Sequence, residues 1–258
     1  MVMPTKRQRL RIAHNWRRKN MVQELGYYRE IRKLFLTWYL NKILKPLSKN
    51  TGLRFDADEE FLTAAEYAAA GTLFENAADE WPEMVQTFTI RMMKRANNIA
   101  NIAKIEWSKA MGVDMSVNPF ASEPWLNPPL RAFQDENVAL IKNIGDEAFQ
   151  KIGTIVENGY KQGISTKKIA EQIANVGDVY AGYRSKLIAR DQLGKLSGNL
   201  TQIRAEISGV DEYEWSSSND ERVRPEHEVW DGDIRSYSKD SPHPGEPIQC
   251  RCVALPII

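Results

Sequence analysis

The sequence predicts an α+β fold that is predominantly α-helical, with long N-terminal helices and a small C-terminal domain containing a short antiparallel sheet. Two observations support this prediction. Apolar residues recur at three- and four-residue steps through most of the first 207 residues, which is typical of helices. After Gly209 the pattern changes to strand-like alternation and proline-rich turns. The chain has no run of about 18 apolar residues, so no membrane-spanning helix is expected.

The first 50 residues are strongly basic. They contain 13 Lys or Arg residues and 2 acidic residues, a net charge of +11, whereas the rest of the chain carries −10. This asymmetry predicts attraction to a polyanion, which is nucleic acid, an acidic protein surface or an anionic membrane. The alternative is an arm that neutralises the acidic body of its own or a neighbouring subunit. The residues expected to contact such a partner are Lys6, Arg7, Arg9, Arg11, Arg17, Arg18 and Lys19.

The N-terminal half contains three predicted helical stretches. An amphipathic stripe covers residues 20–45, and Pro46 is expected to end that helix. An acidic, alanine-rich stretch covers residues 56–82, and a further helical pattern covers residues 84–110. Residues 112–130 hold several prolines without a helical period, which predicts a linker or an extended wrapping segment.

Helical periodicity returns in the C-terminal half. A long helix is expected over residues 131–160, with Gly163 breaking it, followed by a short helix over 167–175 and a longer one over 180–207. Gly209 stands where a left-handed C-cap would fall.

The last 50 residues predict a small sheet. Residues 212–216 alternate polar and apolar side chains as a half-buried strand does, Asp231-Gly232 is a hairpin-type turn signal, and residues 249–256 are expected to form a final strand. The predicted organisation is a basic arm and amphipathic helix, a helical region, a Pro-rich linker and a C-terminal domain, over residues 1–50, 51–111, 112–130 and 131–258.

The C-terminal half also carries a series of short motifs. They are Ile188-Ala-Arg-Asp191, Trp215–His227, Asp231-Gly232, His243-Pro-Gly-Glu246 and Cys250-Arg-Cys252. In order and spacing they resemble the Mu F-like phage head morphogenesis family, over residues 131–258. Many relatives have CxxC or CxxH where this chain has Arg224-Pro-Glu-His227, and the departure removes possible metal thiolates.

The resemblance implies a minor head protein of a tailed phage. It implies a non-enzymatic structural or interaction component that acts in head assembly, genome packaging or DNA ejection. The implied partners are the portal protein, the major capsid protein, or both, within a large assembly, and packaged double-stranded DNA is a further candidate. The implied location is the virion, at the capsid interior or the portal vertex, with the host cytoplasm during assembly. No cofactor is expected.

Twelve residues of this region are expected to be structural. They are Arg190, Asp191, Trp215, Asp220, Arg222, Arg224, His227, Asp231, Gly232, Cys250, Arg251 and Cys252. If the segment around Arg222 and Arg224 is extended, both side chains point to one face. The favoured interpretation is an arginine–carboxylate network that locks the sheet onto the helix containing Arg190, because paired charges are the usual way to bury arginine. The alternative is an anion or phosphate site built by the arginines.

Four residues could ligate a metal: His227, His243, Cys250 and Cys252. Zinc needs about four such ligands, but the CxC spacing is tighter than usual, so free thiols in a packed strand are preferred and no metal is expected. A disulfide fits the closely spaced cysteines poorly, and a reducing compartment is expected. A zinc or thiol enzyme that uses this cluster is kept as an alternative, as is a nucleic-acid-binding module.

Overall fold

The structure of the protein is a computed structural model, and it describes residues 3–50, 53, 60–113 and 123–257. The chain forms two compact units, each assembled from segments that are distant in sequence. The sheet unit comprises Met1–Tyr27, Arg91–Asp135 and Ala189–Ile258, and the helical unit comprises Tyr28–Ile90 and Glu136–Ile188. The boundaries of these units do not coincide with the divisions proposed from the sequence at residues 50, 111 and 130.

The N-terminal residues form one continuous helix rather than an arm followed by a helix. Helix α1 (Lys6–Tyr39) runs through a π-helical turn, η1 (Leu40–Leu44), into α2 (Lys45–Asn50). The expectation that Pro46 ends this helix is therefore wrong. Proline has no N–H to donate to a helix. The π-helical turn before Pro46 accommodates it, because the backbone hydrogen bonds there span five residues instead of four.

The break between the next two helices lies further along the chain than the sequence predicted. Helix α3 (Ala64–Thr87) contains Pro82, and α4 (Thr89–Ala110) starts after a break at Phe88. The acidic stretch predicted as helix begins in residues 54–59, which lie outside the described residues. The predicted break near Pro82 is wrong, and the chain turns at Phe88, whose N–H bonds to the Val85 carbonyl at 3.1 Å.

The C-terminal half is also mainly helical. Their bounds are η3 Pro124–Leu126, α5 Asn127–Gln162, α6 Thr166–Val179, η4 Tyr180–Arg184 and α7 Ser185–Ile207. Residues 114–122 of the predicted linker lie outside the described residues, and its last four residues belong to α5. The two helices predicted after Gly163 are in fact continuous through the π-helical η4. The predicted roles of Gly163 and Gly209 as helix ends are confirmed by their left-handed φ angles of 61° and 67°.

The sheet is small and antiparallel, as the sequence predicted, and it has three strands. The expected final strand over residues 249–256 begins only at Val253, because the residues before it form a turn and irregular backbone. Its elements are β1 (Glu212–Ser216), the short helix α8 (Pro225–Val229), β2 (Ile234–Ser236) and β3 (Val253–Pro256). The strand order is β2-β1-β3, with β1 in the centre. The Asp231-Gly232 turn connects α8 to β2 instead of joining two strands directly, and Gly232 takes a left-handed φ of 89°.

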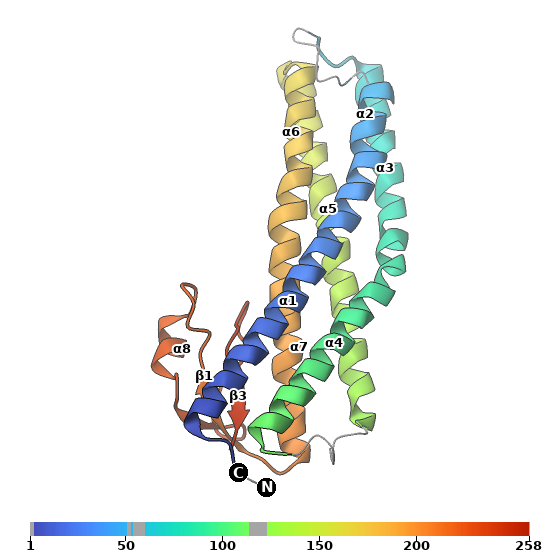
Figure 1. The fold of residues 1–258 in the computed structure, drawn as a ribbon. Helices are drawn as coiled ribbons and strands as arrows, with labels where there is room; N and C mark the ends of the chain where they lie inside the picture. The colour runs from blue at the N-terminus through green and yellow to red at the C-terminus, as the bar shows by residue number, and fades with distance from the viewer. Residues whose placement is uncertain (1–2, 51–52, 54–59, 114–122, 258) are drawn as a thin grey trace. The chain divides into compact units, whose positions relative to one another are not determined.

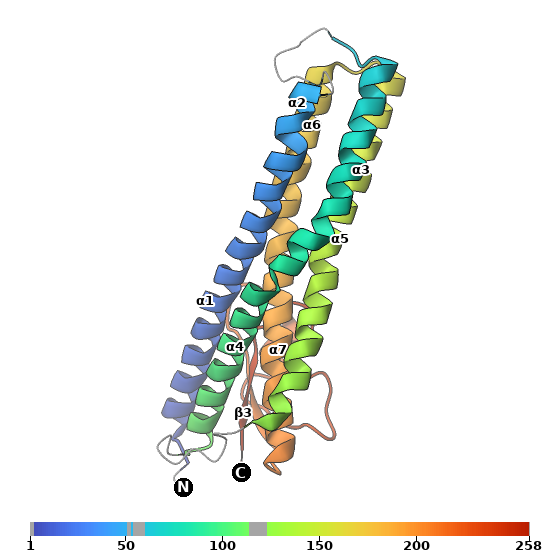
Figure 2. The ribbon, with the colours of Figure 1, turned by 90° about the vertical axis from the view of Figure 1, so that its right-hand side faces the viewer.

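The helical unit buries a cluster of aromatic rings. Figure 2 shows α2, α3, α5 and α6 side by side. Phe35 and Trp38 of α1 contact Trp81 of α3, and their ring centroids lie 5.6 Å and 4.7 Å from that of Trp81. The Tyr39 hydroxyl donates to the Ile173 carbonyl at 2.7 Å. Burying each of these large rings stabilises the unit by about 1.5–3 kcal/mol.

The sheet unit is built on the N-terminal part of α1. Trp16 of α1 is buried with Trp107 of α4, Ala205 of α7 and Leu255 of β3. Figure 1 shows the start of α1 beside α4 and the sheet. The basic N-terminal segment is thus part of a hydrophobic core. Among the described residues, no helix is both long enough and apolar enough to cross a membrane.

Candidate functional site

The seven predicted contact cations fall into two groups, and the first group is used inside the protein. Arg9 is 8% exposed and reaches the sheet. Its Nε donates to Glu214 Oε2 at 2.9 Å, and its Nη atoms donate to the Pro256 and Leu255 carbonyls at 3.0 and 3.1 Å. Arg9 is therefore withdrawn from the predicted contact residues, because all three bonds tie α1 to strands β1 and β3.

Arg17 and Lys19 also have internal partners. Arg17 Nη1 donates to Ser216 Oγ at 2.9 Å, and desolvation lowers the pKa of Arg17. Lys19 Nζ lies 2.6 Å from Oε1 of the buried Glu106. For Arg9, Arg17 and Lys19 the alternative interpretation, an arm that neutralises its own body, describes the structure better than partner contact does.

The second group remains exposed: Lys6, Arg7, Arg11 and Arg18. Arg7, Arg11 and Arg18 are spaced by four and seven residues, which places them along one side of α1. We call these three residues the cationic face. Exposed apolar side chains are interleaved with it, for example Val22 with 58% exposure. A shallow groove of about 330 Å³, lined by Arg18, Val22 and Ile102 among others, runs beside it.

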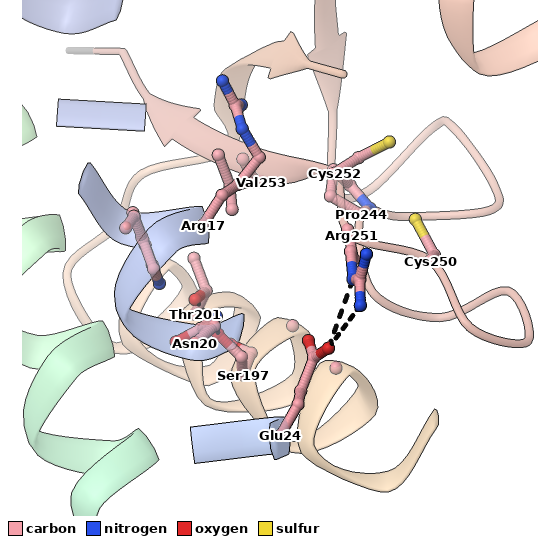
Figure 3. Close-up of a pocket in the computed structure, with 14 residues that line it drawn as sticks. Arg17, Asn20, Glu24, Ser197, Thr201, Pro244, Cys250, Arg251, Cys252 and Val253 are labelled. Atoms are coloured by element: carbon pink, nitrogen blue, oxygen red, sulfur yellow. Dashed lines mark hydrogen bonds and ion pairs between the residues drawn. The ribbon is translucent and has the colours of Figure 1, made fainter. Parts of the chain in front are cut away.

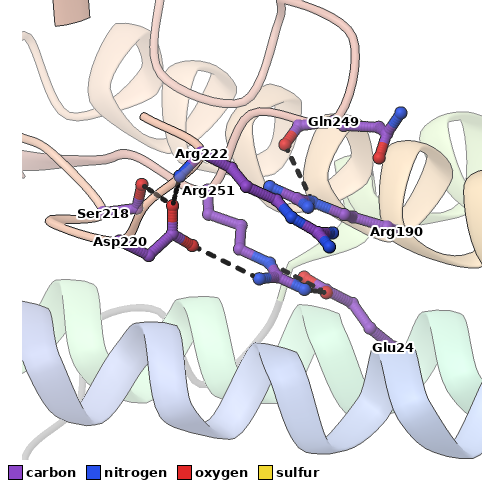
Figure 4. A network of polar contacts seen from close by, with 7 residues as sticks. All are labelled: Glu24, Arg190, Ser218, Asp220, Arg222, Gln249 and Arg251. Atoms are coloured by element: carbon purple, nitrogen blue, oxygen red, sulfur yellow. Dashed lines mark hydrogen bonds and ion pairs between the residues drawn. The ribbon is translucent and has the colours of Figure 1, made fainter. Parts of the chain in front are cut away.

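A polar network joins α1 to the C-terminal segment (Figure 4). Arg251 donates from Nη2 and Nε to Glu24 Oε2 at 2.9 and 3.2 Å, and its Nη1 lies 3.4 Å from Asp220 Oδ2. Desolvation raises the pKa of the buried Glu24, and the Arg251 guanidinium opposes that rise. The sequence analysis missed Glu24, because no local pattern links residues 227 positions apart.

The loop before Cys250 is anchored on α7 by its backbone. Arg190 Nε donates to the Gln249 carbonyl at 3.0 Å, and the Gln249 N–H donates to Asp191 Oδ1 at 2.8 Å. Arg224 Nη2 donates to the Ile248 carbonyl at 2.8 Å. The residues expected to form an arginine–carboxylate network thus do meet at this helix, but several of their bonds go to backbone atoms.

The expectation that Arg222 and Arg224 share one face of an extended segment is wrong. Residues 221–222 form a turn, in which the Arg222 N–H donates to Asp220 Oδ1 at 3.1 Å. Desolvation acts to raise the pKa of Asp220, but that N–H and the Arg251 guanidinium hold it below its ordinary value. Asp220 therefore shapes the turn and pairs with Arg251, while Arg222 is exposed.

Two glycines of α7 allow the loop to lie against the helix. A Cβ at Gly198 would stand 2.4 Å from the Pro244 carbonyl oxygen, and one at Gly194 would stand 2.9 Å from the Cys250 carbonyl oxygen. Any side chain there would displace the loop backbone. The four-residue spacing of these glycines was a signal in the sequence that the analysis did not use.

The histidine and the two cysteines form a buried cluster. His227 Nδ1 lies 3.5 Å from Cys252 Sγ and 3.7 Å from Cys250 Sγ. The three residues are 2%, 6% and 3% exposed, respectively. Both cysteines are free thiols. His243, the fourth ligand candidate, is outside this group, because its Nδ1 lies 3.1 Å from the Tyr213 hydroxyl.

The protonation of this cluster follows from its burial. The side-chain hydrogen bond from Cys252 lowers the pKa of Cys250 to about 7, and the same interaction raises the pKa of Cys252. Cys250 is therefore the thiol of the pair that loses its proton first. Desolvation, followed by the nearby Arg224 charge, lowers the pKa of His227, so its imidazole is neutral there.

Aromatic rings enclose the cluster. The Trp215 ring meets His227 edge-on at 4.9 Å, and the Trp230 ring stacks on it at 5.4 Å between centroids. Asp231 Oδ1 accepts from the Ser217 N–H at 2.7 Å, which fixes the turn that returns the chain to β2. Of the expected structural residues, Trp215, Cys250 and Cys252 thus lie against His227.

The space next to the cysteines is small (Figure 3). A cavity of about 20 Å³ is lined by Asn20, Ser197, Cys250, Cys252 and neighbouring residues. This is room for about one water molecule. A thiol–imidazole pair at this spacing has the distance of a nucleophile and its base, but a substrate has no space beside it.

Residues 150–255 match the family model described as "Phage Mu protein F like protein". The chain is similar to the Mu F-like family. This match confirms the family predicted from the C-terminal motifs, and it points to a protein of phage head morphogenesis. Residues 150–255 include the last third of α5, all of α6 and α7, and nearly the whole sheet.

An uncharacterised protein of Haemophilus influenzae is 30% identical to the chain over 238 residues, or 90% of this chain. The chain spans about half of that relative, 53% of its length. No solved structure matches the chain. The likeness to the relative extends over nearly the whole sequence and so includes the N-terminal helices, which the family model does not cover.

Proposed function

We propose that this protein is a minor head protein of a tailed phage, acting at the capsid interior or the portal region in head assembly, genome packaging or DNA ejection. The observation that carries the proposal is the family match over residues 150–255. The protein works by binding and positioning, without bond chemistry. Its location is the virion, with the host cytoplasm during assembly.

The bonding within the sheet unit supports a role as a rigid adaptor. Arg9 and Arg251 each connect α1 to the C-terminal segment through charged hydrogen bonds. Arg190 and Arg224 hold the loop before Cys250 by its carbonyl groups. Charge-assisted bonds of this kind fix orientation as well as adding stability. Such a unit presents a preformed surface to a partner and loses little conformational entropy on binding.

The cationic face of α1 is the proposed docking surface for the portal or the major capsid protein. Its charge complements an acidic protein surface. The exposed apolar residues Leu10, Val22 and Leu25 lie among the cations, with exposures of 50%, 58% and 43%. Apolar contact area adds affinity against a protein surface, whereas phosphate contacts dominate affinity for DNA. These residues favour a protein partner over packaged DNA.

Burial of the histidine–cysteine cluster supports the non-enzymatic proposal. Both thiols and His227 are less than 7% exposed. A nucleophile must reach its substrate at bonding distance, and the adjoining cavity of about 20 Å³ admits no substrate.

The experiment uses two charge-reversal triples with the same change in net charge. The test variant carries Arg7→Glu, Arg11→Glu and Arg18→Glu. The control carries changes at exposed cations elsewhere: Arg131→Glu, Lys151→Glu and Lys168→Glu. We expect the wild type and the control to be present in purified phage heads and to recover the portal or capsid protein in pull-downs. The test variant should lose that recovery. Absence of the wild-type protein from purified heads, together with pull-downs that recover neither partner, would end the proposal.

DNA binding by the same face is the second candidate, supported by the helical spacing of the three arginines. If DNA is the partner, the logarithm of affinity falls linearly with the logarithm of salt concentration, and the slope shrinks by roughly one unit for each phosphate contact removed. The test triple should then lower the slope by about three relative to the wild type. Binding that is equal in both triples would exclude this face as the DNA contact.

A further inference from the structure

Three potential metal ligands converge in the sheet unit. The ligating atoms of His227, Cys250 and Cys252 all lie within 4.8 Å of one another. Cys250 and Cys252 come from the segment before β3, whereas His227 comes from helix α8. Figure 3 shows both sulfur atoms directed away from Glu24, toward which the intervening Arg251 side chain extends. The fold thus gathers soft donors from two separate segments into one buried place.

The two nitrogen–sulfur distances fit a tetrahedral zinc site. In a tetrahedral zinc site with Zn–S of about 2.3 Å and Zn–N of about 2.05 Å, a sulfur and a nitrogen ligand are about 3.6 Å apart. The observed Nδ1–Sγ distances are 3.5 Å for Cys252 and 3.7 Å for Cys250. Two thiolates and an imidazole are the donors that zinc prefers, and they disfavour magnesium and calcium.

Charge and hydrogen bonding in this place also suit a zinc ion. Two thiolates, a neutral imidazole and Zn²⁺ sum to zero, so the loaded cluster buries no net charge. Backbone N–H groups of Gly245 and Cys252 act on the Cys250 sulfur, and the backbone N–H of Ser218 acts on the Cys252 sulfur. Such N–H groups stabilise thiolates and orient them in the way that second-sphere partners of metal ligands do.

We propose that His227, Cys250 and Cys252 form a zinc site that staples helix α8 to the segment preceding strand β3. Water occupies the fourth position, as it does in zinc sites that have three protein ligands. Binding forms two Zn–S bonds and releases the protons of the two thiols to solvent, with no change of oxidation state. This geometry reverses the preference for metal-free thiols that the sequence alone supported.

A zinc ion at this place would stabilise elements that are short. The sheet has strands of five, three and four residues, and α8 has five. Elements this short bury little apolar surface, and small modules commonly rely on a metal for their stability. The site is independent of the proposed head function, because it concerns the stability of the sheet unit and its test involves no phage component.

The test uses the full-length protein, purified in reductant, loaded with Zn²⁺ and dialysed against metal-free buffer. We expect one zinc per chain by elemental analysis. Substitution with Co²⁺ should give the charge-transfer absorption of cobalt–thiolate bonds, and X-ray absorption of the zinc form should show two sulfur ligands and at least one nitrogen ligand. A reduced protein that retains no zinc, or a metal bound without sulfur, would overturn the proposal.

Variants locate the site. Cys252→Ser and His227→Gln should weaken zinc binding by at least about 100-fold, since each removes a direct ligand. His243→Gln is the matched control, because His243 is bonded to Tyr213 outside the cluster, and it should bind zinc as the wild type does. Equal binding by all three variants would place the metal elsewhere and refute the assignment. If the ligand variants fail to fold, the cobalt and X-ray absorption spectra of the wild type decide the question alone.

Discussion

Replacement of Arg9 by alanine tests whether the N-terminal residues belong to the body of the protein. Arg9 makes three hydrogen bonds, to the Glu214 carboxylate and to the carbonyls of Leu255 and Pro256. The side chains of Arg9 and Glu214 are 9% and 18% exposed. Breaking a fully buried ion pair costs about 3–5 kcal/mol, and the partial exposure of Glu214 reduces this. We expect Arg9→Ala to lower the free energy of unfolding by about 3 kcal/mol.

Arg7→Ala is the matched control for this substitution. Arg7 lies two residues away on the same helix and is exposed, so the change in helix propensity is the same and the lost contacts differ. We expect its effect to stay within about 0.5 kcal/mol. Urea unfolding followed by circular dichroism measures the free energy of unfolding of both variants. In thermal unfolding, Arg9→Ala should lower the melting temperature by about 6–12 °C. Equal stability of the two variants would refute the claim that this segment is structural.

Three further predictions concern the network, the α7 glycines and a turn. A double-mutant cycle between Glu24→Gln and Arg251→Gln should give a coupling of about 1–3 kcal/mol at pH 7 that weakens in acid, as Glu24, with its raised pKa, takes up a proton; a pH-independent coupling would argue against the pair. Gly198→Ala should destabilise by about 1–3 kcal/mol, because its Cβ meets the neighbouring loop backbone, whereas Gly153→Ala, whose Cβ meets nothing, should stabilise by about 0.5–1 kcal/mol in the same thermal melts. Hydrogen bonds from serine side chains lower the pKa of Asp211, so its contribution to stability is present above pH 3.8 and is lost as the pH falls further. Asp211→Asn should therefore flatten that part of a plot of stability against pH in acid unfolding. An unchanged plot would contradict a stabilising role for the Asp211 carboxylate.

The helices could be predicted from the sequence because their signals are local. The apolar period of α5 and the glycines after α5 and α7 mark those helices well, and Gly163 and Gly209 have the left-handed φ angles that end a helix. Two helix ends were misplaced, because Pro46 was taken as a helix end and a break was placed between the stretches 56–82 and 84–110. Pro46 follows a π-helical turn and Pro82 lies inside α3, so the surrounding packing accommodates both.

The contacts of the candidate site could be predicted only in part. The C-terminal motifs identified the correct segments, and the family comparison agrees with them over residues 150–255. The partner of Arg251 could not be foreseen, since Glu24 lies 227 residues away and ordinary helix periodicity surrounds it. Likewise the division of the N-terminal cations into internal and exposed groups depends on which side of α1 meets the sheet. The charge of the segment alone does not determine that side.

A density map of the assembled phage head tests the central claim most directly. The account predicts that the chain is present at the capsid interior or the portal vertex, with Arg7, Arg11 and Arg18 against an acidic protein surface or packaged DNA. It also predicts that Arg9 remains bonded to the sheet of its own subunit. A head without this chain, or one in which the exposed side of α1 faces open solvent, would contradict the account.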